Sequence, residues 1–288
     1  MQKITCEKEL VLFDDWLVRK GRKRSTIRTY KEGIRSITVA LNSMGFTGCI
    51  LDITEDDVQM VKSVLTVKES SKKLYMIAFG KLLECFGRKN VIKDAGLLWN
   101  MEEKRRIFIK RDDYKKMLTT CDEREKLILE LGGHMGLRRS EISRIKLSDI
   151  ESDILKVYGK GHGEGKVVFM KIPTPVQTAI AEYMKVRPST TCDRLLVYSE
   201  GRYKGHGMSG ESVATLVKRV GKRCDVVLTP HSLRRLFATS LYDCGVDLNV
   251  IRDLMRHESI DTTISCYIQV NPELKKKAVT ALCELYGD

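Results

Sequence analysis

The stretch from Thr229 to Tyr267, TPHSLRRLFATSLYDCGVDLNVIRDLMRHESIDTTISCY, contains signals for two consecutive helices. Thr229 is a favourable N-cap residue and Pro230 suits the first helical position, so a helix is expected to begin here. Gly245 is placed to end that helix in a left-handed conformation. Asp247 can cap a second helix directly afterwards.

The same stretch also carries four side chains that suit phosphate chemistry. His231 and Arg234 stand three residues apart, so they project from one face of the first helix. His257 follows the second helix, and Tyr267 comes ten residues later. A guanidinium and imidazoles can bind a phosphate, and a tyrosine hydroxyl can attack one.

Composition favours a partner that is a polyanion. The chain has 288 residues and a formal net charge of +13, with basic residues spread along its length, and such an excess favours nucleic acid. Nine cysteines without a C-x-x-C pair suggest neither a zinc site nor a disulfide framework, and no metal or cofactor is expected. With no signal peptide and no apolar run near ~20 residues, we expect a cytoplasmic protein without a membrane span.

The first 88 residues predict a helical bundle. An amphipathic helix is expected over residues 6–20, and Ser25 is the expected N-cap of the next helix. The apolar stripe of that next helix recurs at spacings of three and four, at Ile27, Tyr30, Ile34, Ile37 and Leu41. Thr54 predicts a third N-cap, and Ser70 or Ser71 a fourth, with a stop at Gly87. Residues 89–106 are interpreted as a linker, and residues 107–288 as a second domain.

Basic residues gather at the start of the second predicted helix and along its outer face. They are Arg22, Lys23, Arg24, Arg28, Lys31 and Arg35. They are candidates for contacts with a DNA phosphate backbone, and a solvated basic surface is the alternative.

The second domain combines helices with a small sheet. Arg111–Thr119 is expected to be helical, and Asp122 to cap the next helix. A glycine turn then leads to Arg138 at a helix start, where exposed N–H groups favour an anion; a surface cation at Arg138 or Arg139 is the alternative.

A hairpin is expected from the strand-like runs 154–158 and 166–170, which flank the glycine-rich loop 159–165. Lys160 on this loop could reach over a bound phosphate and deliver a proton, or simply be a solubilising charge. Further helices are expected from Thr174 and Ser209, and a short strand over Leu195–Tyr198. A last amphipathic helix from Asn271 is expected to dock on its own domain or on a neighbouring copy.

Taken in order, G-L-R-R-S-E, G-K-G, H-S-L-R, a later His and then Tyr resemble the tyrosine recombinase (phage integrase) family, most closely its Xer branch. The resemblance implies a mainly α fold with a small β-hairpin: a helical core-DNA-binding (SAM-like) domain, then a mixed α/β catalytic domain. It also implies a homotetramer on double-stranded DNA at a specific recombination site, held together through the C-terminal helix.

The resemblance further implies the catalytic roles. Arg138 and Arg234 would bind the scissile phosphate, and Lys160 would protonate the departing 5′ oxygen. His231 would assist proton transfer, His257 would hydrogen-bond the phosphate, and Tyr267 would attack phosphorus. Glu141, three residues beyond Arg138, is expected to orient an active-site cation.

Three positions depart from the family pattern. Arg235 follows Arg234 where the family often has histidine, and Met255-Arg256-His257 replaces the common Leu-Gly-His. Tyr267 stands ten residues after His257, whereas nine is usual. One added residue within a continuous helix would rotate the hydroxyl by ~100°. Tyr242 and Tyr286 are weaker substitutes as nucleophile.

Three functions fit this residue set. The first is a site-specific recombinase that forms a 3′-phosphotyrosyl intermediate, as in Xer-type dimer resolution or mobile-element integration. The second is a DNA-binding protein on the same fold that no longer cuts, which the tyrosine spacing favours and the hairpin lysine opposes. The third is a type IB topoisomerase, which would share the chemistry without choosing a site.

Overall fold

The computed structural model describes residues 3–100, 108–159 and 167–257, together with Ser259 and Thr280. The chain divides into two compact units, Met1–Arg105 and Arg106–Asp288, here called unit 1 and unit 2. Three predicted features lie outside the described residues: the loop with Lys160, the segment with Tyr267, and the C-terminal helix.

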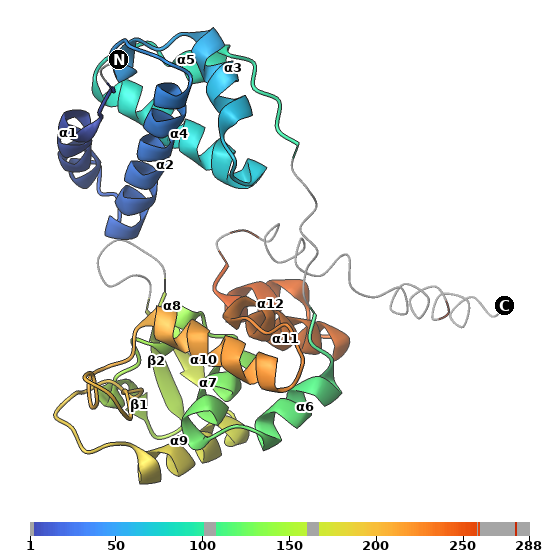
Figure 1. Ribbon diagram of the computed structural model, residues 1–288. Coiled ribbons are helices and arrows are strands. Elements are labelled where there is room, and N and C mark those ends of the chain that lie inside the picture. Colours follow the sequence, from blue (N-terminus) through green and yellow to red (C-terminus); the bar gives the residue numbers. More distant parts are fainter. Residues whose placement is uncertain (1–2, 101–107, 160–166, 258, 260–279, 281–288) are drawn as a thin grey trace. The chain divides into compact units, whose positions relative to one another are not determined.

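Unit 1 is a bundle of helices, drawn in blue to green in Figure 1. Its helices are α1 (Glu7–Arg19), α2 (Arg24–Ser43), α3 (Glu55–Val64), α4 (Glu69–Cys85) and α5 (Val91–Asp94), with a 3-10 turn at Ile50–Asp52. α2 packs along α4, and α1 packs on both. The apolar stripe predicted for α2 is buried at Ile27, Ile34, Ile37 and Leu41, so it forms the centre of this core.

Local capping signals explain some of these helix ends. Thr54 accepts a hydrogen bond from the backbone N–H of Asp57, whose carboxylate accepts one from Thr54, as predicted. The expected cap at Ser25 is wrong: α2 begins two residues earlier, because Lys23 takes an extended conformation at the N-cap without a side-chain bond.

Part of the segment interpreted as a linker packs with unit 1. Ala95 is buried, and Leu97 and Trp99 lie against the core that α1–α4 form. The first compact unit therefore continues past Gly87, where α4 was expected to stop, through α5.

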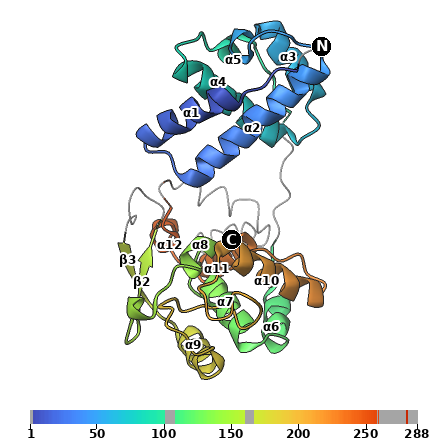
Figure 2. The ribbon, with the colours of Figure 1, turned by 60° about the vertical axis from the view of Figure 1, so that its left-hand side comes forward.

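Unit 2 has a three-stranded sheet and seven helices among its described residues. They are α6 (Arg111–Thr119), α7 (Glu123–Gly133), α8 (Arg139–Ile142), β1 (Ile150–Glu151), β2 (Ile154–Tyr158), β3 (Val167–Lys171), α9 (Thr174–Val186), α10 (Gly210–Arg223), α11 (Pro230–Asp243) and α12 (Leu248–Met255), with a 3-10 turn at Leu147–Asp149. α7 packs against α9, α10 and α11, and it lies between them in both views (Figures 1 and 2). Its apolar residues make it the central helix of this unit.

The sheet is antiparallel in the order β1-β2-β3. Leu155 pairs with Met170 and Val157 with Val168, and Leu155 and Val157 both turn to the core. The strand expected over Leu195–Tyr198 is wrong as a strand. These residues form only isolated bridges, of which Val197 with Gly207 is one, although Leu195 to Val197 are fully buried.

The two helices of the opening stretch are present. Thr229 caps α11 in a reciprocal pair with Ser232, Gly245 follows α11 at φ +78°, and Asp247 caps α12. On α12 only part of the predicted inner face is correct: Ile251 is buried, but Val250 and Leu254 are exposed. Among the described helices, none has the length and apolarity needed to cross a bilayer.

Candidate active site

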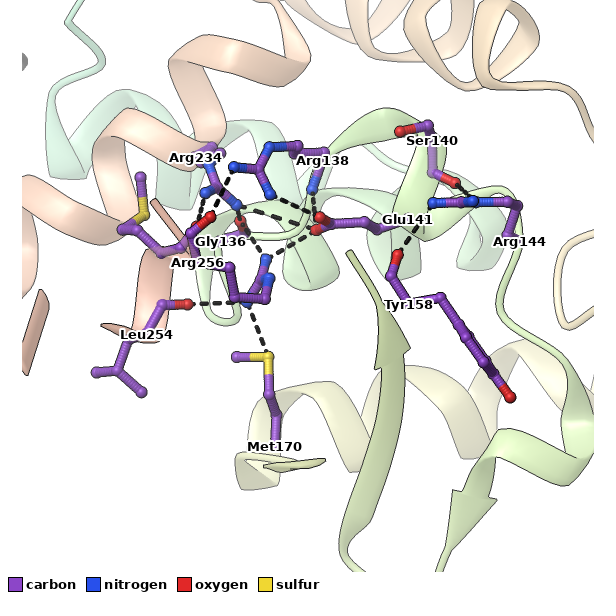
Figure 3. A network of polar contacts seen from close by, with 11 residues as sticks. Gly136, Arg138, Ser140, Glu141, Arg144, Tyr158, Met170, Arg234, Leu254 and Arg256 are labelled. Carbon is purple, nitrogen blue, oxygen red and sulfur yellow. Dashed lines mark hydrogen bonds and ion pairs between the residues drawn. The ribbon is translucent and has the colours of Figure 1, made fainter. Parts of the chain in front are cut away.

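A tight turn leads from α7 to α8. Gly136 has φ +59°, and a Cβ added there would lie 2.9 Å from Cε1 of Phe237 on α11. Glycine avoids both the strain of the left-handed backbone and this collision. The turn therefore passes close to α11, and the carbonyl of Gly136 faces the guanidinium of Arg234 on α11 (Figure 3).

Arg138 and Glu141 form a reciprocal pair at the start of α8. The backbone N–H of Arg138 donates to Glu141 Oε2 at 2.9 Å, and Arg138 Nη1 donates to Oε1 at 2.7 Å. Burial of Glu141 acts to raise the pKa of its carboxyl, but Arg256 and the N–H groups of Arg138 outweigh this effect and hold the pKa below its usual range. Glu141 is thus a buried anion that orients the Arg138 guanidinium, as predicted.

Arg234 reaches the same place from α11. Its guanidinium donates to the carbonyls of Gly136 and Met255, and Nη1 lies 4.0 Å from Glu141 Oε2. The residue is only 4% exposed, because α11 packs its first turns against the turn at Gly136. Two arginines far apart in the sequence therefore converge on one buried carboxylate.

The C-terminal end of α12 also contributes to the site. Arg138 Nη2 donates to the carbonyl of Arg256 at 3.1 Å, and the next residue is His257. Burial, together with the charges of Arg234, Arg138 and Arg256, lowers the pKa of His257 to about 4. The imidazole is consequently neutral at physiological pH and can donate one hydrogen bond.

His231 stands one turn before Arg234 on α11. The residue as a whole is exposed, but partial desolvation of its ring, with the charges of Arg234 and Arg139, lowers the pKa of the imidazole. A neutral imidazole at the surface is able to accept a proton.

Arg144 connects this region to the sheet. Its Nε donates to the carbonyl of Ser140 at 2.8 Å and its Nη2 to the carbonyl of Tyr158 at 3.0 Å (Figure 3). Tyr158 ends β2, two residues before Lys160, so Arg144 ties the base of the predicted hairpin loop to α8.

The structure brings together three of the six predicted catalytic residues, Arg138, Arg234 and His257, around Glu141. His231 lies on the same helix as Arg234, and Lys160 and Tyr267 lie outside the described residues. Sequence reasoning missed Arg256, which pairs with Glu141 at 2.8 Å. The available signal was the arginine itself, standing where the family motif has glycine.

The predicted DNA-contacting residues lie in unit 1, at the α1–α2 turn and on α2. Three of them bind acidic residues there: Arg28 binds Glu32, Lys31 binds Asp14, and Arg35 binds Glu7. Arg22, Lys23 and Arg24 are all exposed, and Arg24 lies 3.5 Å from Asp14. The turn residues Arg22 and Lys23 have no ion pair with the part of unit 1 that is described, so they are best placed to meet a polyanion.

A mainly helical fold with a small sheet therefore carries a site in which arginines converge on a buried carboxylate. Residues 108–273 match the Phage integrase family. This match spans more than half of the chain and most of unit 2. The chain therefore belongs to the phage integrase family.

The chain is also similar in sequence to tyrosine recombinases. The tyrosine recombinase XerA of Pyrococcus furiosus is 32% identical over 174 residues, 58% of this chain and 59% of that protein. The tyrosine recombinase XerC of Corynebacterium glutamicum is 36% identical over 143 residues, 49% of this chain and 45% of that protein. The chain matches about three fifths of the length of the XerA relatives.

Solved structures share the fold. A lambda integrase dimer bound to a COC′ core site has a TM-score of 0.72 at 18% identity, covering 91% of this chain and 77% of that one. The crystal structure of XerA recombinase has a TM-score of 0.54 at 21% identity, covering 95% and 98%. At these identities the likeness shows the architecture expected from the sequence, a helical unit joined to an α/β unit.

Proposed function

We propose that the chain is a site-specific DNA recombinase that cuts and rejoins strands through a 3′-phosphotyrosyl intermediate. The observation that carries this proposal is the convergence of Arg138 and Arg234 on buried Glu141, beside a neutral His257. Arg138 is one-quarter exposed and its bonds to described residues use only two of its five N–H donors, so it can also meet a phosphate.

The proposed reaction exchanges one phosphodiester bond for another. The hydroxyl oxygen of Tyr267 forms a bond to phosphorus while the bond from phosphorus to the 5′ oxygen breaks. His231 takes the proton of the tyrosine, and Lys160 gives a proton to the leaving oxygen. A 5′ hydroxyl of a second strand then reverses the step, so the bond energy is conserved and the strands are exchanged.

The two arginines would stabilise the charge that builds up on the non-bridging oxygens in the transition state. Planar guanidiniums fit paired oxygens, and a buried carboxylate fixes Arg138 before the substrate arrives. His257 would donate a hydrogen bond to the same phosphate.

The partner in this proposal is double-stranded DNA with a specific site, and the active form is a tetramer. Support comes from a lambda integrase tetramer bound to a Holliday junction, a structural neighbour with a TM-score of 0.70. The exposed cations at the α1–α2 turn would contact the backbone, and the C-terminal helix would dock on a neighbouring copy.

The test is the formation of a covalent protein–DNA adduct. Nicked duplexes with randomised centres trap the intermediate, because the short strand next to the cut diffuses away and cannot rejoin. We expect an adduct on denaturing gels, reduced about 100-fold in Arg138→Met or Arg234→Met, the size of effect that losing one oxyanion-stabilising donor has. A protein that binds one sequence tightly and forms no adduct would be a non-cutting binder.

A further inference from the structure

Arg256 has a backbone conformation that arginine rarely adopts. It ends α12 in the left-handed region, with φ 54° and ψ 46°. Glycine takes this conformation without steric cost, whereas a Cβ is strained in it. The contacts of the Arg256 side chain must therefore offset the backbone strain.

The left-handed turn presents two successive carbonyls to Arg234 and Arg138. The carbonyl of Met255 accepts from Arg234, and the carbonyl of Arg256 accepts from Arg138 at 3.1 Å. The position of His257, the next residue, is consequently set by the same turn that binds both arginines.

The side chain of Arg256 folds back into the protein and uses all four hydrogens of its terminal nitrogens. Nη2 donates to Glu141 Oε2 at 2.8 Å and to the carbonyl of Gly136 at 3.2 Å. Nη1 donates to the carbonyl of Leu254 at 2.8 Å and contacts the sulfur of Met170 on β3 at 2.9 Å. These contacts join α12, the glycine turn, α8 and the sheet (Figure 3).

The charges explain why a third guanidinium stands here. The Glu141 side chain is 1% exposed and that of Arg256 is 6% exposed, so each needs a partner of opposite charge. Arg256 lies 2.8 Å from Glu141 Oε2, and Arg234 lies 4.0 Å from the same oxygen. Arg138 donates to Oε1 from its guanidinium and to Oε2 from its backbone N–H. Without Arg256, Oε2 would keep that backbone N–H but lose the guanidinium that lies 2.8 Å from it.

We propose that Arg256 is a positioning residue of this site: it shares the charge of Glu141 with Arg138, and it fixes the turn that carries His257 and whose carbonyls accept from Arg234 and Arg138. This inference rests on the proposed function for its catalytic consequence, and on the geometry alone for its structural part.

The structural part is tested by a double-mutant cycle in urea unfolding. Arg256→Met should lower the folding equilibrium constant about 100-fold, because it removes one of the guanidiniums that neutralise a buried carboxylate. In a Glu141→Gln background the same substitution should cost less than about 10-fold, because the buried carboxylate that Arg256 neutralises is no longer there. Arg256→Lys, which keeps the charge but cannot reach four acceptors, should fall between wild type and Arg256→Met.

The matched control is Arg252→Met. Arg252 lies one turn earlier on α12 and pairs with Asp253 at the surface, so its loss removes the same charge without touching Glu141. Equal effects of Arg252→Met and Arg256→Met, or an additive cycle with Glu141→Gln, would overturn the proposal.

The catalytic part is tested by the rate of adduct formation at saturating DNA, at a temperature where each variant is fully folded. Arg256→Met should lower this rate about 100-fold, as small displacements of catalytic groups do, while the Kd for the same duplex changes less than about 3-fold. A wild-type rate in folded Arg256→Met would overturn it. If wild type forms no adduct with any duplex, the proposed function fails, whereas the unfolding cycle still tests Arg256.

Discussion

Two glycines with similar backbone angles show how much one residue's surroundings matter. Gly136 and Gly245 have φ +59° and +78°. A Cβ at Gly245 would have no atom within 4 Å, whereas one at Gly136 would collide with the Phe237 ring. Gly136 also supplies the carbonyl that Arg234 and Arg256 share.

We therefore predict unequal costs for two identical substitutions. Gly245→Ala should lower the free energy of unfolding by about 1–2 kcal/mol, from backbone strain alone. Gly136→Ala should lower it by about 3 kcal/mol or more, since overpacking adds to the strain. Chemical denaturation of both variants measures the difference. Equal losses would show that the turn at Gly136 is not packed as described.

His257 gives stability a pH dependence. Its pKa is about 4 in the folded protein and 6.5 without the fold, so the unfolded chain binds the proton more readily between these values. Protonation of His257 therefore lowers the free energy of unfolding as the pH drops from 6.5 to 4. At about 1.4 kcal/mol per pKa unit, reduced because the ring is only partly buried, wild type should lose on the order of 2 kcal/mol more over this range than His257→Gln does.

The measurement is urea unfolding of wild type, His257→Gln and His206→Gln at a series of pH values. His206→Gln, at an exposed loop position, is the control for replacing a histidine by glutamine. If His257→Gln follows the wild-type curve, the imidazole is not held neutral by the site.

At the scale of elements, Arg144 joins α8 to the end of β2. Arg144→Met removes the bonds to the carbonyls of Ser140 and Tyr158. We predict that adduct formation at saturating DNA slows about 10-fold, because the strand that leads to Lys160 loses its anchor, while DNA affinity changes little. Lys185→Met, which removes an exposed cation from α9, is the control. Equal rates in the two variants would rule out this role for Arg144.

Elements whose signals are local could be predicted from sequence. Thr54, Asp122 and Thr229 each cap a helix through bonds to residues three positions away, and the sequence displays these pairs directly. The strand expected at Leu195–Tyr198 failed for the opposite reason. Its apolar residues are buried, but a strand needs a partner along its length, and apolar character does not reveal one.

The same distinction between local and tertiary signals decides which site residues could be predicted from the sequence. Arg138, Glu141, Arg234 and His257 could be selected because they sit in recognisable motifs. Arg256 could not, because its role depends on Glu141, Gly136 and Met170, which only the tertiary fold brings to it. The side chain that departs from the motif is therefore the one that joins α12 to the glycine turn, α8 and the sheet.

At the scale of the whole molecule, the proposed partner makes DNA binding depend on salt. Removing one cation that binds a phosphate should reduce the slope of log K against log salt by about 0.9. Arg22→Gln with Lys23→Gln should therefore lower the slope by about 2. Lys81→Gln with Lys89→Gln removes the same charge from lysines that bind Glu84 and Asp94, and should change the slope less. Equal slopes in both double variants would remove the α1–α2 turn from the interface.

The most direct test of the central claim is to identify the tyrosine that carries the DNA. The adduct trapped on a nicked duplex would be digested and its peptide mapped by mass spectrometry, with Tyr267→Phe and Tyr242→Phe measured beside wild type. The account predicts a 3′ phosphate linked to Tyr267, loss of the adduct in Tyr267→Phe and its retention in Tyr242→Phe. A link to another tyrosine, or no adduct on a tightly bound site, would contradict it.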